Sequence, residues 1–107
     1  MENKKISMYQ GENKSIIFTV TQKDGSPKIL DNGNAKFVIT NGNSIIIQKI
    51  LGNGVLISGN KITVLLDASD TIGLYGNYSF ELRAVDEQEN SNVVSTGIIE
   101  IKKSFTV

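Results

Sequence analysis

The fold of this chain is decided by the stretch from Gly76 to Ile101, GNYSFELRAVDEQENSNVVSTGIIEI. Two runs of alternating apolar and polar residues flank the polar segment Glu87–Asn90, a pattern typical of a β-hairpin. One half-buried hairpin is not stable alone in water, so other strands must cover its apolar face. The stretch therefore predicts a larger antiparallel structure built onto this hairpin.

The register of the hairpin follows from pairing Asp86 with Ser91 across the loop. Phe80 then lies opposite Gly97, where the missing side chain leaves room for the ring in a cross-strand pair. Because side chains alternate between the faces of a strand, every second residue from Phe80 shares its buried face. The same register pairs Tyr78 with Ile99 and Ala84 with Val93.

The composition indicates a single domain that spans residues 1–107. Apolar residues make up 39% and charged residues 21% of the chain, which excludes a disordered tail and a membrane span. Lys plus Arg equals Asp plus Glu, so the net charge is zero and neither nucleic acid nor a membrane is an expected partner. Residues 1–14 have no apolar run of the kind found in signal peptides, so secretion is not expected.

The absence of cysteine and histidine restricts the chemistry that the chain can perform. It removes the ordinary zinc sites and the Ser–His and Cys–His nucleophile pairs. The acidic loop at residues 86–90 lacks the glycine and terminal glutamate of a calcium loop, so a solvated hairpin tip is expected. Asp67 and Asp70 are explained by the start of a short helix. No catalytic residue, metal, cofactor or small-molecule substrate is expected.

Short strands separated by Gly- and Asn-rich turns fill the rest of the chain, without a long helical period. This pattern predicts an immunoglobulin-like antiparallel β-sandwich of about seven to nine short strands. One helical turn is expected near residues 67–72, with Asp67 or Ser69 as its N-cap. A two-residue turn at Gly59-Asn60 pairs Ile57 with Ile62 and Val55 with Val64. The other strands are expected at residues 5–10, 15–23, 35–40 and 44–51.

Two features leave alternatives open. The strand at residues 44–51, SIIIQKIL, is apolar on both faces in its first half. Either neighbouring strands cover both of its faces, or it is an edge that another subunit covers. Tyr78 is expected in the core, with its hydroxyl bonded to the backbone near Asp70 as in a tyrosine corner, the alternative being a sugar site.

A candidate interface follows from the predicted faces. Val94 and Ile98 fall on the outward face of the hairpin, with Val85 beside them and Ile17 outward on its own strand. A contiguous exposed apolar group usually marks a contact surface. The alternatives are that a loop or the terminal segment 104–107 folds over this group, or that it is simply exposed.

Four segments resemble the immunoglobulin-like modules of tailed-phage virions, in particular the N-terminal domain of the baseplate upper protein of phages of Gram-positive bacteria. This chain departs from that family's pattern within the second segment, where Ile29 stands in place of the usual aspartate, and between the second and third, where Leu30 to Ala35 replaces a Leu-Thr-Gly-Ala run. The segments are Gly11–Val20 (GENKSIIFTV), Asp24–Leu30 (DGSPKIL), Ala35–Ile39 (AKFVI) and Gly76–Ile101.

The resemblance implies a non-enzymatic structural or adaptor component of a phage or prophage tail or baseplate. It would bind other tail proteins or copies of itself, and it would reside in the virion after synthesis in the bacterial cytoplasm. The alternative function is a carbohydrate-binding or adhesive domain at a cell surface. The resemblance points to no catalytic residue.

Overall fold

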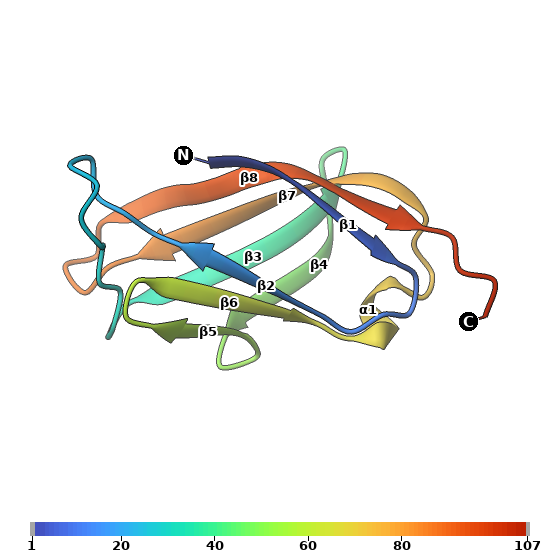
Figure 1. The fold of residues 1–107 in the computed structure, drawn as a ribbon, viewed down its shortest axis with the longest axis horizontal. Helices are drawn as coiled ribbons and strands as arrows, with labels where there is room; N and C mark the ends of the chain where they lie inside the picture. The colour runs from blue at the N-terminus through green and yellow to red at the C-terminus, as the bar shows by residue number, and fades with distance from the viewer. Residues whose placement is uncertain (1, 107) are drawn as a thin grey trace.

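The computed structural model describes residues 2–106, and these residues form eight strands and one short helix (Figure 1). The all-β prediction is therefore confirmed. The strands pair in the order β1-β8-β7-β3-β4-β5-β6-β2. Their bounds are β1 Glu2–Tyr9, β2 Lys14–Thr19, β3 Asn34–Asn41, β4 Ser44–Leu51, β5 Gly54–Ser58, β6 Lys61–Leu66, β7 Gly76–Val85 and β8 Ser91–Lys102, with α1 at Ala68–Thr71.

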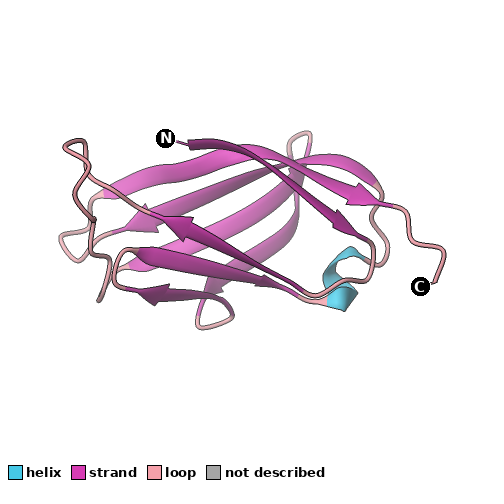
Figure 2. Ribbon diagram, viewed as in Figure 1, coloured by secondary structure: helices cyan, strands magenta, loops and turns pink. Residues whose placement is uncertain are grey.

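The sheet folds over on itself to form two layers (Figures 1 and 2). One layer contains β1, β8, β7, β3 and β4, and the other contains β5, β6 and β2. Within residues 2–106, strand pairing connects the two layers only between β4 and β5, through two residue pairs. The orders β3-β7-β8 and β2-β6-β5 match strands C-F-G and B-E-D of the immunoglobulin sandwich. The predicted immunoglobulin-like β-sandwich is thus confirmed.

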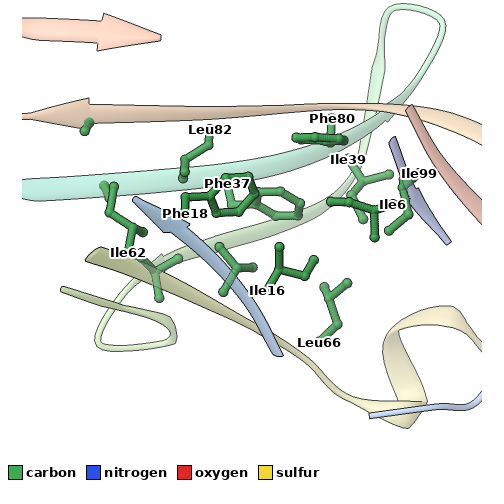
Figure 3. Packing of buried hydrophobic residues seen from close by; sticks show 14 of the residues in the cluster. Ile6, Ile16, Phe18, Phe37, Ile39, Ile62, Leu66, Phe80, Leu82 and Ile99 are labelled. Carbon is green, nitrogen blue, oxygen red and sulfur yellow. The ribbon is translucent and has the colours of Figure 1, made fainter. Parts of the chain in front are cut away.

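The core lies between the layers and is built from the alternate residues of each strand (Figure 3). Phe18 of β2 contacts the rings of Phe37 and Phe80, although these strands are far apart in the strand order. The two-residue turn at Gly59-Asn60 is also confirmed, since it pairs Ile57 with Ile62 and Val55 with Val64. The buried apolar residues also include Ile6, Met8, Ile16, Leu30, Ala35, Ile39, Leu66, Leu82, Ala84, Ile99 and Ile101.

Two strand pairs are parallel, contrary to the wholly antiparallel prediction. β1 runs parallel to β8, with Ile6 beside Ile99, and β4 runs parallel to β5 over its last two residues. β1 is held against β8 because the side chains of Ile6 and Met8 are buried in the core. Alternation in a short first strand predicts its buried face, but not the direction of its neighbour.

The predicted register of the β7–β8 hairpin is right at one end and wrong at the other. Tyr78 pairs with Ile99 and Phe80 with Gly97, as expected. Beyond Leu82 the register shifts by one, so Val85 rather than Asp86 pairs with Ser91, and Ala84 pairs with Asn92 rather than Val93. Val94 is the extra residue of a β-bulge, which places two residues of one strand against one of the other.

Gly97 has a second role that the sequence did not predict. A Cβ atom built on Gly97 would overlap the carbonyl oxygen of Lys4 in β1. Lys4 and Gly97 are register partners in the parallel β1–β8 pair. The glycine therefore permits the close approach of β1.

We predict that Gly97→Ala destabilises the fold, because even one methyl group would push β1 away from β8. Gly73→Ala is the matched control, since a Cβ atom at Gly73 meets nothing within 4 Å. Chemical denaturation should show a free energy of unfolding lower by about 1–3 kcal/mol for Gly97→Ala and little changed for the control. Equal effects of the two substitutions would contradict the close approach.

The local predictions for the helix and Tyr78 are confirmed in part. Asp67 is the N-cap of α1, and the Asp70 carboxylate accepts a hydrogen bond of 2.7 Å from the Asp67 amide. Tyr78 is only partly buried against the core. Its hydroxyl donates to the carbonyl of Tyr75 at 3.2 Å, so the predicted bond to the backbone near Asp70 is wrong.

Ser95 in β8 is fully buried, and its hydroxyl oxygen has no hydrogen-bond partner among the described residues. A buried hydroxyl without a partner destabilises a fold, because the hydrogen bonds it made to water are lost. We predict that Ser95→Ala raises the free energy of unfolding by roughly 1 kcal/mol. A lower thermal midpoint for Ser95→Ala would show that the hydroxyl contributes to stability.

Candidate contact surfaces

The solvent-facing side of the five-stranded layer, called the outer face below, contains a shallow hollow with an exposed isoleucine at each end. The registers align Ile98 of β8, Ser79 of β7, Thr40 of β3 and Ile45 of β4 in one row across the sheet. The two isoleucines are 48% and 57% exposed. They stand about 14 Å apart, three strand spacings, and the small polar residues between them form part of the floor.

A second hollow lies on the outer face where β3, β4 and β7 run side by side. Ile50, Leu51 and Val85 contribute its apolar lining, with Lys36 and Arg83 beside them. Ile50 and Leu51 are 44% and 40% exposed. The outer face thus contains two shallow hollows, each lined in part by exposed isoleucine side chains.

The structure does not bring the four predicted interface residues together. Ile98 and Val85 lie on the outer face, at different hollows. Ile17 is 56% exposed, but it lies on β2 in the other layer. Val94 packs against the core, because the bulge turns it away from the outward position that strict alternation predicts. The predicted contiguous group is therefore wrong as a set.

From Ser44 to Lys49 one side of β4 is a free edge, so the alternative in which neighbouring strands cover β4 on both sides is wrong for this part of the strand. One side of β4 pairs with β3, whereas the other side pairs with β5 only at Ile50 and Leu51. Within residues 2–106, no strand covers that side of β4 from Ser44 to Lys49.

A β-bulge determines which side chains of β4 face the solvent. Ile47 pairs with Ile39 and packs against the core, and the register then shifts so that Ile45 pairs with Thr40. Ile46 is the extra residue. Without this shift, alternation would place Ile45 on the inward face with Ile47. The only sequence signal of this feature is the run of three isoleucines.

Residues 104–106 of the terminal segment do not cover the exposed apolar residues of the outer face, and Val107 lies outside the described residues. The amide of Ser104 donates to the side chain of Gln10 at 3.0 Å, next to the end of β1. Phe105 is 88% exposed, so its ring does not fill a hollow in this chain. Of the alternatives for the candidate interface, coverage by residues 104–106 is thus wrong.

The loops at one end of the sandwich are tied together. The long connection at residues 20–33 bonds to the β5–β6 turn through the Leu30 amide and the Gly59 carbonyl, at 2.8 Å. It also joins the β7–β8 loop, because Lys28 forms an ion pair of 3.0 Å with Asp86. These bonds hold three loops in one arrangement.

Asp86 is buried, so the expectation of a solvated hairpin tip is wrong for this residue. Its carboxylate accepts hydrogen bonds from the amides of Gln88 and Asn90, at 3.0 and 2.9 Å, and from Lys28. The bond from the Asn90 amide, together with that from Lys28, lowers the pKa of Asp86 to about 2. The four loop residues that follow it, Glu87 to Asn90, are exposed, as expected.

A polar cleft lies beside this loop cluster. Thr19, Thr21, Gln22, Lys23 and Asn92 contribute polar groups to it, and Val20, Val93 and Val94 contribute apolar ones. Its lining contains no aromatic ring. The described part of the chain contains no group of three or more acidic, His or Cys residues placed to hold a metal ion. Between residues 2 and 106 no helix has the length and apolar character needed to span a bilayer.

The fold defines this chain as an immunoglobulin-like β-sandwich module. No family model and no curated protein matches the sequence. Among solved structures, the chain is similar to the fibronectin(III)-like modules of Clostridium thermocellum CbhA. The sequence identity is 13% and the TM-score 0.49, over 97% of this chain and 93% of that one. A likeness of this degree says nothing about function.

The lowered pKa of Asp86 predicts loss of stability in acid. Because the folded pKa lies near 2, below the ordinary value of 3.8, the stabilisation is complete above about pH 4 and is lost as the pH falls toward 2. Thermal midpoints of the wild type and Asp86→Asn, measured from pH 5 to pH 2, check this. The substitution should lower the midpoint at pH 5, and the two curves should converge in acid. If the difference between the two thermal midpoints is the same at every pH, the ionised Asp86 carboxylate is not the source of the acid sensitivity.

Proposed function

We propose that this domain is a non-enzymatic assembly module that binds other proteins through its outer face. The observation that carries the proposal is the pair of apolar hollows lined by Ile45 and Ile98 and by Ile50, Leu51 and Val85. Exposed apolar groups gathered on one side of a rigid domain are typical of protein contact sites.

The charge distribution of the chain supports the same proposal. The chain has no net charge, so long-range attraction to a highly charged polymer contributes little. The absence of cysteine and histidine leaves no Cys–His or Ser–His pair for covalent catalysis. Asp86 and Asp70 are each paired with a lysine from a distant part of the chain.

We further propose that the assembly is a phage or prophage tail or baseplate. The support for this finer proposal is the resemblance of four segments to the baseplate module. In the structure these segments build the frame: the first ends in β2, the third lies in β3 and the fourth forms the β7–β8 hairpin. The second forms a turn in which Asp24 accepts a hydrogen bond from the Ser26 amide and Pro27 bridges to Thr21.

The alternative, a glycan-binding or adhesive domain, is favoured by one observation. The cleft beside the loop cluster offers hydroxyl, amide and ammonium groups from Thr21, Gln22, Lys23 and Asn92, which suit a polyhydroxylated ligand. The cleft lacks the aromatic ring on which sugars commonly stack, so we rank this function second. A glycan array with the purified domain tests it.

The assembly proposal predicts that the chain is part of a virion and that Ile98 contributes to its binding. Tail particles from the bacterium that carries the gene should contain peptides of this chain after density-gradient purification and mass spectrometry. In a pull-down of tail proteins, Ile98→Lys should weaken retention at least tenfold, because it places a charge in an apolar contact.

Ile17→Lys is the matched control, because Ile17 has a similar exposed fraction on the opposite layer. Both variants should keep the thermal midpoint of the wild type. If Ile98→Lys binds like the wild type, the hollow beside it is not the contact surface. If purified particles lack the chain, the tail or baseplate role is wrong.

A further inference from the structure

The outer side of β4 from Ser44 to Lys49, called the β4 edge below, is a free sheet edge. Backbone groups on such an edge can pair with a strand from another chain. Natural proteins block this with a proline, with lysines that point into solvent or with a bulge, and of these the β4 edge has the bulge at Ile46. The β4 edge has no proline, and its one charged residue is Lys49.

Lys49 does not protect the edge, because its ammonium group is withdrawn into the fold. It forms an ion pair of 2.8 Å with Asp70 of the turn after β6, and its side chain is only 13% exposed. The side chains left facing the solvent, Ile45, Ile46 and Gln48, are all uncharged. The bulge adds to this surface, because it turns Ile45 outward.

The edge at the far end of the sheet is protected by charge. β1 has lysines at positions 4 and 5, of which Lys5 is exposed and Lys4 lies over the ring of Phe18, 5.1 Å from its centroid. An approaching strand would have to meet the charge of Lys5. The β4 edge, unlike that of β1, presents no exposed charge.

Resting on the proposed function, we infer that the β4 edge pairs with the β4 edge of a second copy of this chain, in antiparallel orientation about a two-fold axis. An uncharged strip meets its own copy without like-charge repulsion. The two-fold arrangement gives both copies the same contacts and closes the assembly at two chains. It would join the two five-stranded layers into one continuous ten-stranded layer.

The contact is expected to be small. The β4 edge is six residues long, about 20 Å of strand, and the bulge at Ile46 interrupts its regular part. Its total area would lie near the lower limit of specific interfaces, roughly 1,200 Å². We therefore expect a dimer that forms at high concentration and dissociates on dilution.

Sedimentation of the purified chain over a range of concentrations tests the inference. The wild type should shift from one chain to two as the concentration rises. Ile46→Lys should remain a single chain at all concentrations, with its thermal midpoint at low concentration unchanged. Ile17→Lys, the matched exposed isoleucine on β2, should dimerise like the wild type.

Because the chain contains no cysteine, single thiols locate the contact directly. Gln48→Cys should be cross-linked to a second copy by a short bis-maleimide, whereas Ile17→Cys should not. A chain that stays single throughout, an Ile46→Lys variant that still dimerises, or cross-linking through Ile17→Cys alone would each overturn the inference. Open-ended filaments would do the same, because a two-fold contact closes.

The test of the β4 edge contact and the test of the proposed function can fail independently of each other. A chain that never dimerises but is retained on tail proteins through Ile98 would overturn only the β4 edge contact. A chain that dimerises through β4 but is absent from tail particles would overturn only the tail or baseplate role.

Discussion

The packing of Phe18 against Phe37 and Phe80 is the interaction on which the rest of this structure depends. The ring centroids lie 6.4 and 6.2 Å from that of Phe18, and those of Phe37 and Phe80 are 5.6 Å apart. Phe18 comes from the three-stranded layer and the other two from the five-stranded layer, so the contact holds the layers together. Side chains that face this gap must be apolar and close-packed, and those on the other side of each strand are left to the solvent.

This constraint explains the unusual surface of β4. Among the described residues, β4 and β5 pair through their backbones only at Ile50–Gly54 and Leu51–Val55, so most of β4 stands at the open side of the sandwich. Lys49 points inward there, and the ion pair with Asp70 makes its partial burial tolerable. The inward side chain of Lys49 fills the open side of the sandwich. The solvent-facing positions of β4 are then occupied by Ile45 and Ile46 and carry no charge. The neutrality of the β4 edge is therefore a consequence of how the fold is closed.

Much of the fold could be predicted from the sequence, because alternation and turn residues are local signals. The β5–β6 register follows from Gly59-Asn60, and the pairing of Phe80 with Gly97 follows from alternation within the hairpin. The parallel placement of β1 could not be predicted, since it depends on contacts between residues more than 90 positions apart, such as Lys4 and Gly97. The role of Asp86 was hidden for the same reason, because its partner Lys28 is 58 residues away.

The exposed apolar surface was harder to predict than the core, and the two bulges show why. Each inserts one residue into a strand, and a shift of one residue exchanges the two faces of everything beyond it. In β8 the extra residue brings Val94 onto the core, and in β4 the shift turns Ile45 out to the solvent. A polar residue at a core position interrupts the apolar alternation and can be recognised in the sequence. An isoleucine that a bulge turns toward the solvent does not interrupt the alternation. The surfaces through which such a module contacts its neighbours are thus set by features that hydrophobic alternation does not record.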